Sequence, residues 1–232
     1  MILCPVCGKG NGDLAVTCFS CRGYLQSKVD ALDLFATAWA VIESPTKAFR
    51  KIALATHKNY TLLLASLFGI AWTYSAFWIS NAAALVPNLF VLMVTGILVG
   101  PLLGIFCLLG VVTVALWSGR RIGGQANFRN LLALTAYSMI PLILSLIFIL
   151  PVDIAVFGLA FFGSPPTPRE LKPMIYGVLL ALHSGMFAWT LCLMVLSASV
   201  AHGVSHWKGT GLALLIALIL CAVIFIPHLL RG

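Results

Sequence analysis

Long uncharged stretches of the chain predict helices that cross a membrane. Four such stretches contain 61, 23, 35 and 22 residues, and they lie at 59–119, 130–152, 173–207 and 209–230. A spanning helix needs about 20 mostly apolar residues, so the first stretch holds two spans and each of the others holds one. We therefore expect an all-α transmembrane bundle of about five spanning helices, at 61–82, 90–117, 131–150, 174–200 and 210–229.

The apolar segment 154–163 does not fit this scheme. It contains ten residues, which is too short to cross a bilayer, and Asp153 directly precedes it. We interpret the segment as an interfacial or re-entrant continuation of the third span, with a place in an additional span as the alternative. Asp153 is then expected near the end of a span.

The overall composition supports a membrane protein and suggests its orientation. Hydrophobic residues make up 61% of the chain, charged residues only 9%, and the net charge is +8. With five spans, 11 of the 14 Lys and Arg residues lie on the side of the N-terminus, and the positive-inside rule places that side in the cytosol. We expect the cell membrane of a bacterium, or alternatively an ER or Golgi membrane. Basic and aromatic residues do not interleave on a soluble surface, so no nucleic acid partner is expected.

Two C-x2-C pairs open the chain. The first pair is Cys4 and Cys7, the second is Cys18 and Cys21, and ten residues separate the two pairs. Two disulfides in a secreted domain would also use four cysteines, but in a reducing cytosol this spacing favours a metal. Four thiolates suit structural Zn²⁺ and leave no coordination position for a catalytic water. We expect a zinc ribbon at 1–26, with Gly8 and Gly23 supplying the positive φ of its turns.

An amphipathic region at 27–58 separates the ribbon from the membrane domain at 59–232. Apolar residues at helical spacing predict a helix at 30–43 with Asp30 as its N-cap. A second helix is expected from Ser44, with Pro45 at its first position. Whether these helices lie on the membrane surface or pack on the bundle stays open at this point.

Two further motifs resemble the Yip family of membrane proteins (Ypt/Rab-interacting proteins). The segments "SPTKAFRKIA" (44–53) and "GGQANFRNLLALTAYSMIPLIL" (123–144) contain its P-x-x-x-F-(K/R) and Y-S-x-x-P elements, which are Pro45, Phe49, Arg50, Tyr137, Ser138 and Pro141. The resemblance covers about 40–229. It implies about five spans and vesicle-trafficking work with small GTPases of the Rab class and related membrane proteins. The family's acidic, leucine-containing cytosolic segment is replaced here by the zinc ribbon, as in bacterial-type members.

The predicted spans offer one polar candidate site and two faces for helix packing. His183 lies inside span four and is a candidate intramembrane polar site, although a histidine bonded to a neighbouring helix is the plainer interpretation. Small residues recur every four positions in spans two and four, and they predict that these two spans pack closely. A homodimer seam is the alternative for these faces. The residues are Gly96, Gly100, Gly104, Gly177, Ala181 and Gly185.

These patterns predict a protein without catalytic activity. We recognise no nucleophile with a base, no phosphate loop and no carboxylate pair in the sequence. The interpretation is a membrane organiser or adaptor whose ribbon binds another protein through Leu14, Val16 and Phe19 beside Lys9 and Arg22. The alternative is a transporter or channel for an uncharged or lipid-like solute. A transporter would need a polar, water-accessible cavity at His183, whereas an adaptor would have a closed bundle.

Overall fold

Long helices make up most of the computed structural model, which describes residues 2–12, 14–26 and 31–229. Five of the described helical segments are long and apolar enough to cross a membrane. They are α3 (Thr61–Ile79), α4 (Leu89–Arg121), the composite segment Ile140–Phe162, α9 (Pro173–His202) and α10 (His206–Leu229). The prediction of a five-span, all-α bundle is confirmed.

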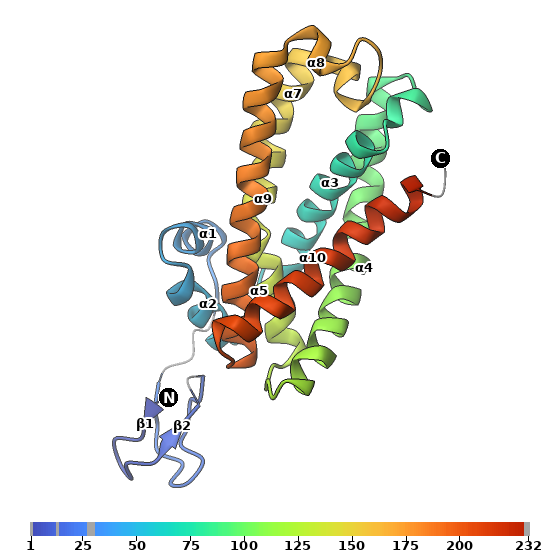
Figure 1. Ribbon diagram of the computed structural model, residues 1–232. Coiled ribbons are helices and arrows are strands. Elements are labelled where there is room, and N and C mark those ends of the chain that lie inside the picture. The colour runs from blue at the N-terminus through green and yellow to red at the C-terminus, as the bar shows by residue number, and fades with distance from the viewer. Residues whose placement is uncertain (1, 13, 27–30, 230–232) are drawn as a thin grey trace.

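The elements outside the spans lie at the two ends of the bundle (Figure 1). A small β module, formed by β1 (Ile2–Leu3) and β2 (Gly10–Asn11), lies at one end beside α1 (Leu34–Glu43) and α2 (Pro45–Leu54). The short helix α8 (Pro168–Leu171) lies at the opposite end. The bundle therefore carries the β module and two further helices at one end, and short connections at the other.

The third span lies further along the chain than the sequence predicts, at Ile140–Phe162 instead of 131–150. It is preceded by α5 (Phe128–Ser138) and is built from α6 (Ile140–Leu144), the π-helical turn η2 (Ser145–Ile149), α7 (Leu150–Phe157) and the 3-10 turn η3 (Gly158–Phe162). The segment 154–163 thus continues the third span, which corrects the interfacial or re-entrant interpretation.

Asp153 explains why the sequence misplaces this span. An acidic residue normally marks the end of a span because an isolated charge in lipid is costly. Here the Asp153 side chain is only 1% exposed, and its Oδ2 lies 2.7 Å from Nε2 of His183 on α9. The span continues past Asp153 because this side chain has a partner inside the bundle.

The two helices before the bundle pack against it and also keep an open face. Asp33 caps α1 by accepting the Ala36 N–H at 2.7 Å. The helix therefore begins later than the sequence suggests, and the expected cap Asp30 lies outside the described residues. Val41 of α1 is buried, whereas Phe35 and Trp39 are exposed. Packing on the bundle is thus confirmed for one face of α1, whereas contact of the opposite face with the membrane surface stays a prediction.

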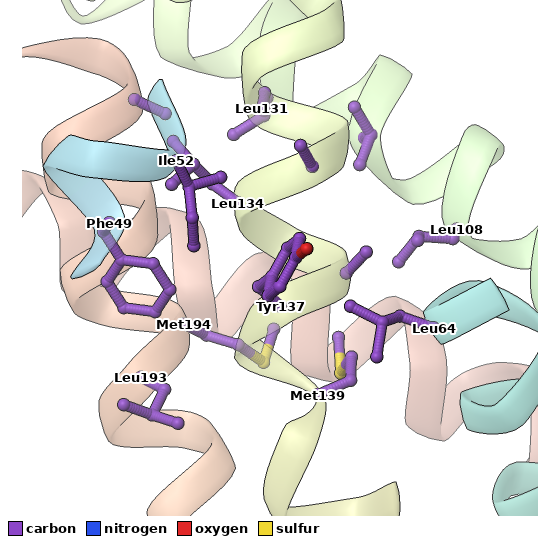
Figure 2. Packing of buried hydrophobic residues seen from close by; sticks show 14 of the residues in the cluster. Phe49, Ile52, Leu64, Leu108, Leu131, Leu134, Tyr137, Met139, Leu193 and Met194 are labelled. Atoms are coloured by element: carbon purple, nitrogen blue, oxygen red, sulfur yellow. The ribbon is translucent and has the colours of Figure 1, made fainter. Parts of the chain in front are cut away.

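Both family-like motifs meet in the main core (Figure 2). Phe49 of α2 and Tyr137 of α5 are completely buried in the same cluster. The Tyr137 hydroxyl donates a hydrogen bond to the backbone oxygen of Asn59 at 3.1 Å, just before α3 begins. Figure 2 shows Met194 of α9 beside them. The motifs therefore join α2, α5 and the start of α3 into one end of the bundle.

The glycines of α4 pack against α3, which corrects the predicted pairing of spans two and four. A Cβ on Gly100 would lie 2.7 Å from the Cα of Ile70, and a Cβ on Gly104 would lie 2.2 Å from the Ala65 oxygen. At Gly96 the Tyr74 ring of α3 occupies the space that a Cβ would need. On α9, by contrast, a Cβ at Gly177 or Gly185 meets nothing within 4 Å, and Ala181 between them is exposed.

Candidate functional site

The β module is built from two similar halves. In the first half the Cys4 N–H donates to the Lys9 oxygen and the Gly8 N–H donates back to the Cys4 oxygen, both at 2.9 Å. The same two bonds recur around Cys18, with each donor and acceptor fourteen residues further along the chain. Each C-x2-C pair therefore lies in a tight turn that aims backbone N–H groups at the sulfurs.

One turn residue differs from the sequence prediction. Gly8 has a φ of +68°, as expected, but in the second half Arg22 takes the positive φ, at +57°. Gly23 has another role, because a Cβ there would lie 3.2 Å from the Cys21 sulfur and 3.2 Å from a Val6 methyl group. Its N–H approaches the Cys21 sulfur at 3.4 Å. Close approach to the thiols, rather than backbone conformation, requires this glycine.

The four cysteine sulfurs converge on one point. All four lie within 4.8 Å of one another, with the Sγ atoms of Cys4 and Cys21 3.5 Å apart and those of Cys7 and Cys18 3.6 Å apart. A disulfide joins sulfurs at about 2.05 Å, so the cysteines are free thiols. Thiolates around a tetrahedral zinc lie about 3.8 Å apart, given Zn–S bonds of about 2.3 Å. The arrangement fits a four-thiolate metal site.

The electrostatics of the four thiols also favour a bound cation. The backbone N–H of Cys21 lowers the pKa of Cys18 to about 6. The Gly23 N–H lowers the pKa of Cys21, but hydrogen bonds with the sulfurs of Cys4 and Cys7 outweigh it and raise that pKa to about 12. The hydrogen bonds among the sulfurs thus favour the thiolates of Cys4 and Cys18 and disfavour that of Cys21. A metal ion at their centre would favour all four thiolates.

Asn11 joins the two halves of the module, and the sequence analysis did not single it out. Its side chain is buried, donates to the Lys9 oxygen at 2.8 Å and accepts the Phe19 N–H at 3.1 Å. One amide therefore holds both cysteine turns in register. The sequence predicted no strand here, so nothing in it marked this asparagine.

Four apolar side chains are exposed on the module. Leu3, Val6, Phe19 and Tyr24 are between 62% and 74% exposed. The Lys9 ammonium group lies 5.9 Å from the centre of the Phe19 ring. We call these four apolar residues the ribbon patch. It differs from the predicted surface, because Leu14 and Val16 instead line a cavity against Lys58, the last residue of the juxtamembrane region, and Arg129 of the membrane domain.

A second polar cluster lies inside the bundle. The Ser145 hydroxyl lies 2.8 Å from Nδ1 of His183, and Nε2 of His183 lies 2.7 Å from Oδ2 of Asp153. The prediction that His183 bonds to a neighbouring helix agrees with this geometry. Neither partner could be assigned from the sequence, because Ser145 and Asp153 lie 38 and 30 residues away from His183.

The cluster opens into a cavity of about 410 Å³ between α3, the third span, α9 and α10. Aromatic rings dominate its wall, including Trp78 and Phe161, whose rings are stacked with centroids 6.2 Å apart. The Phe161 ring stacks in turn on the His183 imidazole. The bundle is therefore not completely closed at His183, although the cavity is mostly apolar rather than polar.

Ser145, His183 and Asp153 are residue types that also form hydrolase triads, a combination that the sequence analysis did not recognise. Such a triad needs donors for the oxyanion of the transition state. The Ser145 N–H is already used inside its helix, where it bonds to the oxygens of Leu142 and Pro141. The nearby Ser184 hydroxyl donates to the Leu180 oxygen at 2.8 Å. Neither of these two groups is therefore free to stabilise an oxyanion.

Fold and sites together define an α-helical membrane protein with five spans and an N-terminal four-cysteine module. The chain matches the family model of the Yip1 domain over residues 39–226, and it belongs to this family of non-enzymatic membrane proteins. The match excludes the cysteine module and includes both motifs described above. No curated protein and no solved structure matches the chain.

Proposed function

We propose that the protein is a non-catalytic membrane organiser or adaptor whose cysteine module holds structural Zn²⁺ and binds another protein. The observation that carries this proposal is the ribbon patch, four exposed apolar side chains on a module of some 25 residues. Apolar surface that is exposed and contiguous marks sites of protein interaction, and we propose that these four side chains form such a surface. The Yip1 domain, which lies outside this module, anchors it to the bilayer.

Binding of zinc would supply the free energy that folds the module. Its described residues form two short strands and one isolated bridge, and so small a segment has no hydrophobic core of its own. Structural zinc contributes on the order of 10–16 kcal/mol in comparable peptides. With all four thiolates committed to the metal, the ion would hold the ribbon patch rigid and perform no chemistry. We further propose the domain limits 1–26, 27–58 and 59–232.

For orientation we propose that the module faces the cytosol of a bacterial cell, with an ER or Golgi membrane as the alternative. The excess of Lys and Arg on the N-terminal side and the four free thiols support this side. A protease site inserted after Ser164 should be cut by protease added to intact cells, and one inserted after Gly123 should be protected. The reverse pattern would contradict the orientation.

Photocrosslinking tests the adaptor proposal directly. Benzoylphenylalanine placed at Phe19, in the ribbon patch, should form a discrete set of protein adducts in native membranes. The same probe at Leu14, which faces the protein's own membrane domain, should give no such adducts and serves as the matched control. If substitution of Phe35 on α1 abolished these adducts and substitution of Val6 did not, recognition would lie on α1. That result would contradict the proposal.

A further inference from the structure

The cavity beside His183 has no assigned occupant, and its wall combines aromatic rings with one buried carboxylate. The aromatic residues that line it are Trp72, Tyr74, Trp78, Phe161, Tyr176 and Phe187. Asp153 contributes the carboxylate and is 1% exposed. Among the described residues that line the cavity there is no Lys or Arg.

Only one of the two carboxylate oxygens of Asp153 has a hydrogen-bond partner among the described residues. Its Oδ2 is bonded to His183, whereas its Oδ1 is buried and has no hydrogen-bond partner among the described residues. The Ser145 hydroxyl can donate to Nδ1 of His183 while the Nε2–H donates to Asp153. In that arrangement the imidazole is neutral, and the carboxylate keeps its charge. A buried carboxylate with a free oxygen requires a donor, and a cation suits it best.

We propose that this cavity binds a lipophilic amine, meaning a molecule with an apolar body and a protonated amine head. The ammonium group would lie beside Asp153, whose buried Oδ1 would turn towards the cavity to accept its hydrogen bond. It would also lie against the aromatic side chains of the wall, where cation–π attraction favours it. The apolar body would occupy the rest of the 410 Å³ cavity. An anionic head is excluded by the carboxylate, and an uncharged head leaves the charge of Asp153 uncompensated. This site is independent of the ribbon, so its failure would leave the adaptor proposal untouched.

Binding of labelled decylamine to the full-length protein in phosphatidylcholine nanodiscs tests the site, with empty nanodiscs as the blank. We expect saturable binding of about one molecule per chain. Unlabelled decanol, which has the same chain and an uncharged head, should compete at least tenfold more weakly, and decanoate should not compete. Equal competition by decanol, stronger competition by decanoate or the absence of saturable binding would each overturn the proposal. This comparison needs no variant.

Variants then locate the site. Asp153→Asn should weaken binding at least tenfold, and Ser184→Trp, which fills the cavity but leaves Asp153 and His183 unchanged, should abolish it. Glu170→Gln is the matched control, because this acid is exposed on α8 outside the span, and it should bind like wild type. Undiminished binding by Ser184→Trp would show that the amine lies elsewhere. Loss in Glu170→Gln equal to that in Asp153→Asn would show attraction to surface charge only.

Discussion

Individual glycines decide how closely α3 and α4 approach. A Cβ at Gly69 would lie 2.1 Å from the Gly100 oxygen, and a Cβ at Gly104 would lie 2.5 Å from the Gly69 Cα. These are contacts with backbone, which cannot rotate away as a side chain can. Small residues on both helices thus allow backbone-to-backbone packing, the arrangement that membrane helices use in place of a hydrophobic driving force.

Adding one methyl group at this contact should separate the two helices. Gly104→Ala should lower the free energy of unfolding by about 1–3 kcal/mol, the usual cost of overpacking. Gly110→Ala is the control on the same helix, because a Cβ there meets nothing within 4 Å, and it should have little effect. Reversible unfolding in mixed micelles measures both. Equal stability of the two variants would show that α3 and α4 are not in backbone contact.

Lys58 is the residue whose charge depends most clearly on its surroundings. Its ammonium group donates to the oxygens of Ile52 and Ala53 at the end of α2. Burial and, as the smaller cause, the neighbouring Arg129 together lower the pKa of Lys58 from 10.5 to about 8. Because the folded chain then holds fewer protons than the unfolded chain between about pH 8 and 10.5, this group makes stability rise with pH across that window.

Removal of the neighbouring charge should reverse part of this effect. In Arg129→Gln the pKa of Lys58 should move up from about 8 towards 10.5. An NMR titration of ¹³C-methylated lysines follows this change directly. Lys47, which is exposed on α2, serves as the internal reference and should titrate identically in both proteins. An unchanged Lys58 would show that Arg129 does not act on it.

At the scale of elements, the number of spans could be predicted, but their partners could not. Five spans follow from the length of the uncharged runs, because lipid tolerates few other patterns. The small-residue spacing of α4 and α9 predicts a close packing face on each. Only α4 uses its face within the described chain. The spacing alone does not say which helix lies opposite a small-residue face, so the sequence could not predict this difference. The third span was misplaced because the partner of Asp153 comes from α9, and hydropathy does not register such a pair.

The exposed face of α1 provides a test at this scale. Phe35 is 83% exposed although α1 packs on the bundle through Val41, and we expect Phe35 to dip into the membrane interface. An environment-sensitive fluorescent amino acid at position 35 should emit at a shorter wavelength than the same residue at position 47 of the basic face of α2. Similar emission from both positions would show that α1 lies away from the bilayer.

At the scale of the molecule, the two sites differ in how far the sequence reveals them. The clustering of the four cysteines could be predicted because all their spacings are local, and the turns repeat after fourteen residues. Of the four residues of the ribbon patch the sequence predicted only Phe19, since packing on the bundle decides that Leu14 is covered and Val6 is not. The cluster around His183 combines residues from the third span and α9, so only the fold brings it together.

The central claim is that metal folds the cysteine module and that the folded module binds a protein partner. The most direct measurement determines zinc per chain and photocrosslinked partners for wild type and for Cys4→Ser with Cys7→Ser. We expect about one zinc per chain in wild type, as four thiolates bind one ion. The double variant should lose both the zinc and the adducts formed from position 19, with the five spans still inserted and thermally intact. Unchanged metal content together with unchanged adducts would contradict the account.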